Sequence, residues 1–244
     1  MLRVEKLDVA YGHLQILRQV DMHIKNGEIV AILGANGAGK TTLLKSVMGL
    51  LPPKAGKVYY RGKDVTGTPT FELARQGISF VPEERNIFQA MSVEENLLLG
   101  AYYNKDKAKI AQNLKKVYDM FPRLAERRKQ LSGTMSGGER QMLAIGRGLM
   151  NEPHLIILDE PSMGLSPTNV LVVFETIKTL TSQEVTIAIV EQNVHATLNV
   201  ASRAYVMEHG AVVMEGTSEE LSGNDYVKRM YLGQSIETEN ETEA

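Results

Sequence analysis

The spacing of apolar residues along the chain follows two patterns, and each predicts a different kind of element. Short apolar runs, such as Ile29–Leu33 and Leu155–Leu158, indicate strands that are buried on both faces, whereas the alternation of Val20, Met22 and Ile24 indicates a half-buried strand. Strands are expected at residues 2–9, 20–24, 29–33, 57–60, 78–81, 155–158 and 185–190, and in a hairpin of 203–207 with 211–215.

From about residue 84 to residue 152 the pattern is that of helices. Ser92 and Glu95 fit a capping box, in which the serine caps the start of a helix and the glutamate reaches back to it. Apolar residues then recur at helical spacing in two stretches. They are Ile110, Leu114, Val117 and Phe121 in the first stretch, and Met142, Ile145 and Leu149 in the second.

These elements predict an α/β fold in one domain, residues 1–235. Its core would combine residues 1–83 with residues 153–235, and residues of about 84–152 would form a helical insertion. Residues 236–244 are acidic and contribute no core residues, so we expect them to form a disordered tail.

Composition narrows the possible functions. The chain has 244 residues, a net charge of −2 and no cysteine, so it lacks the basic field of a nucleic-acid-binding protein and cannot use thiol chemistry. No apolar run approaches the about 20 residues of a membrane-spanning helix. The first residues, Met1–Lys6, carry charges where a signal peptide would be apolar, so we expect a cytoplasmic protein.

The most informative motif is a glycine-rich loop that follows the expected strand Ile29–Leu33. It fits the pattern G-x-x-x-x-G-K-[ST] and leads into a helix, which is the context that makes this pattern a phosphate site. Backbone N–H groups would surround the phosphates of ATP, Lys40 would reach the terminal ones, and the Thr41 hydroxyl would bind Mg²⁺. The loop residues are Gly34, Ala35, Asn36, Gly37, Ala38, Gly39, Lys40, Thr41 and Thr42.

Two further motifs fit nucleotide chemistry. The apolar run Leu155–Leu158 ends in Asp159 and Glu160, where Asp159 would hold Mg²⁺ and Glu160 would orient or deprotonate the attacking water. A second helix start, Ser136–Glu139, has two bare glycines after its capping serine, and its N–H groups form another anion cradle. Two such cradles in one chain suggest that two chains enclose one nucleotide. The residues of this second cradle are Ser136, Gly137, Gly138 and Glu139.

In their order and spacing, the three motifs resemble those of the ATP-binding-cassette (ABC) ATPases over nearly the whole chain. The resemblance implies a P-loop core sheet, an antiparallel β subdomain and an inserted helical subdomain. It also implies a head-to-tail dimer, homomeric or heteromeric, in which each ATP lies between the phosphate loop of one chain and the Ser136–Glu139 segment of the other. By the same resemblance Tyr11 stacks on adenine.

Within this family several stretches are similar to the ATP-binding subunits of branched-chain amino acid importers, with the urea importers close by. The stretches are Val81–Phe88, Ser92–Leu97, Thr134–Arg147 and Val190–His195. The resemblance implies membrane permease subunits as partners, with an external solute-binding protein acting through them, and a place on the cytoplasmic face of the membrane. The permease contact is expected near residues 83–95.

Three positions depart from the general cassette pattern. Glu83 replaces a glutamine that senses Mg²⁺, water and the permease, and Gln192 replaces a histidine that contacts the γ-phosphate. Residues 164–167 replace a loop that usually ends in aspartate. We predict that Gln192 donates an uncharged hydrogen bond, since an amide cannot carry a proton. His195 is expected to be an ordinary helix-surface residue.

The leading hypothesis is therefore an ATP-hydrolysing importer subunit with Glu160, Lys40 and Gln192 as catalytic residues. Glu83, Thr41 and Asp159 are the expected metal-site residues. The alternatives are a subunit of a transporter for urea or another small solute, an exporter subunit for lipid or lipopolysaccharide, and a soluble cassette ATPase without a transport role.

Overall fold

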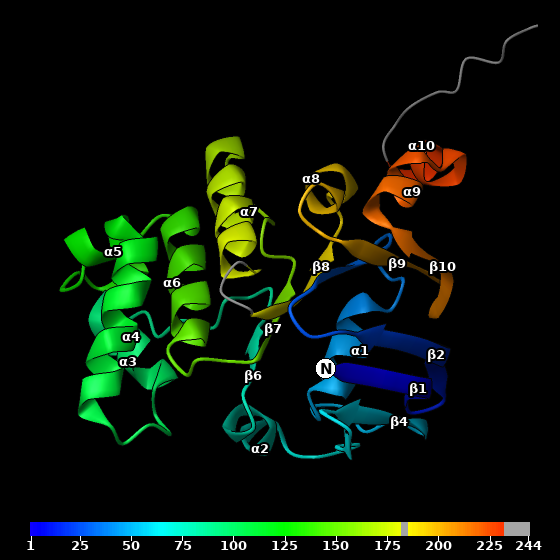
Figure 1. Cartoon of the computed structure of the whole chain (residues 1–244), viewed down its shortest axis with the longest axis horizontal. Helices are drawn as coiled ribbons and strands as arrows, with labels where there is room; N and C mark the ends of the chain where they lie inside the picture. Colours follow the sequence, from blue (N-terminus) through cyan, green and yellow to red (C-terminus); the bar gives the residue numbers. More distant parts are fainter. Residues whose placement is uncertain (182–184, 232–244) are drawn as a thin grey trace, which may run out of the picture.

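The computed structural model describes residues 1–181 and 185–231. The predicted acidic tail lies outside the described residues. Two sheets and a group of helices make up the fold (Figure 1). The first sheet is antiparallel, with the order β2-β1-β4-β5. Its strands are β1 (Leu2–Tyr11), β2 (Leu14–Ile24), β4 (Ala55–Tyr60) and β5 (Lys63–Asp64).

The second sheet has the order β10-β9-β3-β8-β7-β6 and is parallel except for the β9–β10 hairpin at its edge. Its strands are β3 (Ile29–Leu33), β6 (Ile78–Val81), β7 (Leu155–Asp159), β8 (Thr186–Glu191), β9 (Arg203–Glu208) and β10 (Ala211–Thr217). The expected strands are confirmed, with β1 and β2 longer than the sequence pattern predicted.

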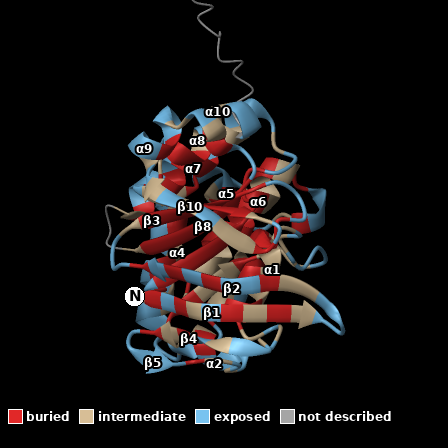
Figure 2. Ribbon diagram, turned by 90° about the vertical axis from the view of Figure 1, so that its right-hand side faces the viewer, coloured by how far each residue is buried: buried red, intermediate tan, exposed pale blue. Residues whose placement is uncertain are grey.

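The central strands are apolar throughout because both faces of this sheet are covered. In β3, Ile29, Ala31 and Leu33 face one core cluster, while Val30 and Ile32 face the other. The second cluster also contains the buried side of the antiparallel sheet and residues of α1 (Lys40–Val47), so α1 lies between the two sheets. Figure 2 shows the buried strands enclosed by exposed outer surfaces.

Helices cover the other face of the parallel sheet and extend to one side of the molecule (Figure 1). One exception is α2 (Thr70–Arg75), which buries Leu73 in the second core cluster. The covering helices that precede β7 are α3 (Val93–Gly100), α4 (Lys107–Met120), α5 (Pro122–Glu126), the 3₁₀ turn η1 (Ser132–Thr134) and α6 (Gly137–Leu149). Those that follow it are α7 (Pro167–Thr181), α8 (Val194–Leu198), α9 (Ser218–Gly223) and α10 (Asp225–Tyr231). The residue boundaries proposed for the core and the helical insertion stay a prediction.

Both predicted capping boxes are present. The Ser92 side chain accepts a hydrogen bond from the Glu95 backbone, and Ser136 does the same with Glu139, so α3 and α6 begin where the sequence indicates. Among the described residues, no helix is long and apolar enough to cross a membrane.

Candidate functional site: a nucleotide site at the strand ends

The glycine-rich loop joins β3 to α1 in a path that only small residues allow. Gly39 has φ 104°, and a Cβ there would lie 2.7 Å from the Leu17 side chain. At Gly34 a Cβ would lie 2.4 Å from the Met207 carbonyl oxygen. The loop is thereby held against neighbouring strands, and it leads directly into the start of α1, where helix N–H groups could bind a phosphate.

Lys40 is the first residue of α1 and is 4% exposed. Its Nζ donates to the carbonyl oxygens of Gly34 at 2.8 Å and Ala35 at 3.2 Å, and lies 3.6 Å from Glu160 Oε1. A buried ammonium held by the loop and by one carboxylate supplies positive charge at the phosphate cradle.

Asp159 ends β7 beside the loop because β7, β8 and β3 are parallel neighbours whose carboxyl ends meet at one edge. Its Oδ1 accepts a hydrogen bond from Thr41 Oγ1 at 3.4 Å. Burial, together with the nearby charges of Glu160 and Glu83, raises the pKa of Asp159 to about 6, against the opposing effects of Thr41 and Lys40. The charged form of this carboxyl group is therefore disfavoured, and a cation bound beside it would stabilise that form.

Glu160 adopts φ 47°, the left-handed region that side chains rarely enter, and it is 7% exposed. Gln192 follows β8 and donates from Nε2 to both oxygens of Glu160, at 2.8 and 2.7 Å. The amide therefore fixes the orientation of the carboxylate. His195 is an exposed residue of α8, and its Nδ1 lies 3.5 Å from Asn199 Nδ2.

Lys40, Thr41, Glu160 and Gln192 line one cavity of about 470 Å³, and Asp159 lies beside it through its contact with Thr41. Its walls are formed by Ile16, Asn36, Gly37, Gly39, Lys40, Thr41, Thr42, Glu83, Glu160, Met163 and Gln192. Tyr11 ends β1 on the same hairpin as Ile16 and is 49% exposed, which leaves its ring available to a purine.

The donor set suits Mg²⁺ together with a nucleotide. The described residues hold no cluster of three metal-ligating side chains, whereas Thr41 and Asp159 offer hard oxygen atoms beside a phosphate cradle. Mg²⁺ is usually held by one or two carboxylates and by substrate phosphates rather than by an all-protein cage. The residues therefore fit a metal that arrives with its nucleotide.

The second cradle does not line this cavity. Ser136 caps α6, and Glu139 closes the capping box and pairs with Arg127 Nε at 3.2 Å. A Cβ at Gly137 would meet only the Gly164 carbonyl oxygen, at 4.0 Å, whereas one at Gly138 would clash with Asn169. Gly137 thus leaves open space at a helix start, and this cradle has no phosphate loop of its own chain beside it.

Two charged residues near the site were not predicted. Arg85 donates to Gln141 Oε1 at 2.7 Å and to the Met163 carbonyl oxygen at 2.8 Å, which joins α6 to the loop after Glu160. Glu191 ends β8 as a 2% exposed carboxylate. The sequence could have indicated Glu191, because it ends an apolar run in the same way that Asp159 ends the apolar run of β7.

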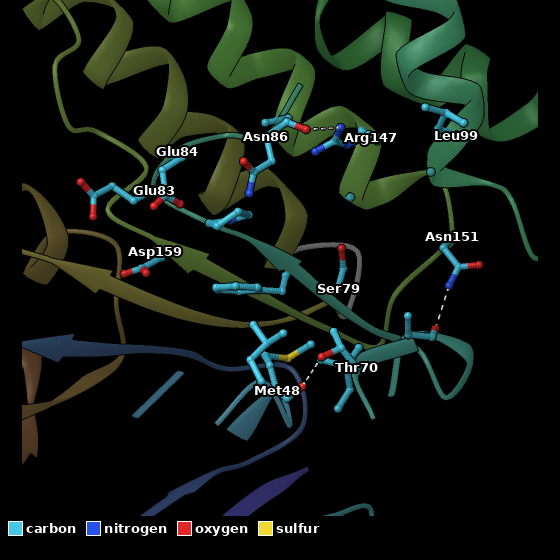
Figure 3. A pocket seen from close by; sticks show the side chains of 18 of the residues that line it. Met48, Thr70, Ser79, Glu83, Glu84, Asn86, Leu99, Arg147, Asn151 and Asp159 are labelled. Atoms are coloured by element: carbon cyan, nitrogen blue, oxygen red, sulfur yellow. Dashed lines mark hydrogen bonds between the residues drawn. The ribbon is translucent and has the colours of Figure 1, made fainter. Parts of the chain in front are cut away.

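A larger cleft of about 730 Å³ lies between α2, α3 and α6, and reaches Thr41 and Asp159 at one end. Figure 3 shows Glu83 and Asp159 at that end and Leu99 and Asn151 at the other. Arg147 donates to the carbonyl oxygens of Asn86 and Arg85, at 2.7 and 3.0 Å. The cleft therefore extends from Leu99 and Asn151 to the Thr41 and Asp159 side chains of the candidate nucleotide site.

Comparison with known proteins agrees with this geometry. Residues 17–163 match the family described as ABC transporter. The chain belongs to the ABC transporter family. The high-affinity branched-chain amino acid transport ATP-binding protein BraG of Pseudomonas aeruginosa is 46% identical over 233 residues, covering 96% of this chain and 100% of BraG. The probable branched-chain amino acid transport ATP-binding protein LivF of Archaeoglobus fulgidus is 38% identical, covering 96% and 99%.

The fold of the ABC cassettes is also found in solved structures. The ADP conformation of MJ1267, an ATP-binding cassette of an ABC transporter, superposes with a TM-score of 0.83 at 28% identity, covering 96% of this chain and 99% of that one. The family and the fold class expected from the sequence are confirmed.

Proposed function

We propose that this ABC protein binds and hydrolyses ATP to power the import of branched-chain amino acids through membrane permease subunits. The observation that carries the catalytic part is the single cavity in which the phosphate loop, Glu160 and Gln192 meet. The solute is inferred from BraG and LivF, whose names give branched-chain amino acid transport. The working location is then the cytoplasmic face of the membrane, where permeases hold the chain.

Each residue has a separate task in this proposal. The loop N–H groups and Lys40 would bind the phosphates. Thr41 and Asp159 would hold Mg²⁺, which when bound would supply neutralising charge at the transferred phosphate. Glu160 aligns the attacking water and takes its proton, while Gln192 keeps Glu160 oriented. Glu83 lines the same cavity and is proposed as a further residue that would help to hold the metal.

We propose that a second cassette completes the site. Ser136 and Gly137 lie outside the cavity of their own phosphate loop, so their anion cradle is available to a nucleotide held by another chain. In a head-to-tail pair each ATP would contact both chains, which stabilises the closed dimer relative to the open one. The partner is a second copy or a related cassette.

The permease is proposed to dock in the 730 Å³ cleft. Its rim carries exposed apolar side chains, including Phe88 at 53% and Tyr102 at 78%, which a monomer would otherwise leave in water. The cleft includes residues of the predicted contact segment 83–95 and ends at Thr41 and Asp159, so a docked segment could respond to the nucleotide.

The test of the catalytic proposal is Glu160→Gln in the purified chain. We expect ATP binding to persist, the phosphate release rate to fall at least about a hundredfold, and ATP to produce a stable dimer in size-exclusion chromatography with light scattering. Glu215→Gln is the control, since Glu215 pairs with Arg203 at the sheet edge. A Glu160→Gln variant that hydrolyses ATP at the wild-type rate would exclude Glu160 as the catalytic residue.

A further inference from the structure

Glu191 is a buried carboxylate that the proposed mechanism does not use. It is the last residue of β8 and is 2% exposed. Its Oε1 accepts the backbone N–H of Ser162 at 2.8 Å, and its Oε2 accepts the N–H of Gln192 at 3.2 Å. A buried carboxylate is costly unless such donors surround it, so this position needs an explanation.

The segment that Glu191 holds is the strained turn after β7. Glu160 adopts φ 47°, a conformation that is strained for a residue with a side chain and persists only where the surroundings impose it. Ser162, which donates to Glu191, is only two residues further on. The contact between Glu191 and Ser162 therefore fixes the part of the turn that follows Glu160.

Three successive residues, the last two of β8 and the one that follows it, contact the turn in three different ways. The Val190 carbonyl oxygen accepts the Glu160 N–H at 2.9 Å. Glu191 accepts the Ser162 N–H, and Gln192 donates to the Glu160 carboxylate. Glu191 also accepts the N–H of Gln192, so one carboxylate links the backbone beyond Glu160 to the residue that orients the Glu160 side chain.

We propose that Glu191 is a positioning residue for ATP hydrolysis, which holds Glu160 in its strained conformation by bridging Ser162 and Gln192. This inference rests on the proposed role of Glu160. It requires a carboxylate, because both oxygens accept N–H groups. A glutamine would place an NH₂ group against N–H donors that now face a carboxylate oxygen. An aspartate keeps the charge but is one methylene shorter.

The test is a steady-state ATPase measurement on Glu191→Gln and Glu191→Asp in the full chain with Mg²⁺. We expect kcat to fall about tenfold or more in both, with KM for ATP within about twofold, because a small displacement of a catalytic group impairs the chemical step and leaves the phosphate loop intact. In the background of Glu160→Gln, Glu191→Gln should cause no further loss, since it acts through Glu160.

Thr186→Val is the matched control. Thr186 is fully buried at the other end of β8, and its Oγ1 accepts the Gly27 N–H at 3.0 Å, so its loss perturbs the same strand away from Glu160. We expect that variant to melt at a lower temperature with kcat within about twofold of wild type. If Glu191→Gln behaves like Thr186→Val, or if either folded Glu191 variant keeps wild-type kcat, the positioning role is wrong. A wild-type rate in Glu160→Gln alone would instead overturn the proposed catalysis.

Discussion

Asp159 should make the nucleotide-free protein less stable than it could be, so that Asp159→Asn stabilises the fold while it removes activity. The carboxyl group is 2% exposed, and burial is the largest cause of its raised pKa. Asparagine has nearly the same shape and can still accept the hydrogen bond from Thr41. It carries no charge at any pH, so it avoids the cost of a buried anion.

The magnitude follows from the pKa of Asp159, which rises from 3.8 in the unfolded chain to about 6 in the folded one. Between these values the folded state keeps a proton that the unfolded state has lost. Stability therefore falls as pH rises through this window, by about 3 kcal/mol at most. An asparagine at this site is also a buried polar group, so we expect Asp159→Asn to raise the free energy of unfolding by less than this, about 1–2 kcal/mol at pH 7.5.

The assay is thermal unfolding of the nucleotide-free protein in chelator, from pH 4.5 to pH 8. A gain of about 1–2 kcal/mol corresponds to a rise in melting temperature of about 2–8 °C for a chain of this size. The gain in stability should shrink toward pH 4.5, where the carboxyl group of Asp159 is largely protonated and, like asparagine, uncharged. With Mg²⁺ and ATP the wild type should become the more stable of the two, because Asp159→Asn removes one of the anionic groups proposed to hold the metal.

Asp119→Asn is the control, because Asp119 is exposed and pairs with Lys115 on the surface of α4. It should change the melting temperature little at any pH in this range. Equal melting temperatures for wild type and Asp159→Asn at pH 7.5 would refute the reasoning, as would a gain that does not depend on pH.

Two further predictions concern the edges of the site. Tyr11→Ala should raise KM for ATP several-fold with little change in kcat, because stacking on adenine is worth about 1 kcal/mol and does not involve the reacting atoms. Tyr11→Phe should keep the wild-type KM. An unchanged KM in Tyr11→Ala would exclude stacking. Phe88→Ala should leave the ATPase rate of the isolated chain unchanged but weaken co-purification with the permeases about tenfold or more. Val213→Ala, at an exposed apolar position on β10, is the control. If Phe88→Ala co-purifies with the permeases as well as wild type does, the permease docks elsewhere.

Much of this architecture could be predicted from local pattern. The apolar strand, the glycine-rich loop and the capping residues Ser92 and Ser136 each determine short-range structure, so β3, α3 and α6 begin where the sequence indicates. The proximity of Thr41 and Asp159 could also be predicted from the expected strands, since the carboxyl ends of neighbouring parallel strands lie at the same edge of a sheet.

The contacts that depend on tertiary packing could not be predicted in the same way. The roles of Glu191 and Arg85 arise because their partners, Ser162 and Met163, follow a turn whose path depends on β8 and α6. The left-handed conformation of Glu160 has no local signal either, since glutamate is not a residue that favours positive φ. Such features depend on neighbours distant in sequence.

The most direct test of the central claim is transport by a reconstituted complex. This chain would be purified from native membranes with the proteins that accompany it and placed in liposomes with ATP on the cassette side and the solute-binding protein on the other. We predict ATP-dependent uptake of labelled leucine, which disappears when the chain carries Glu160→Gln. Uptake of urea but not leucine would contradict the assigned solute, and a chain that co-purifies with no permease would contradict the transport function.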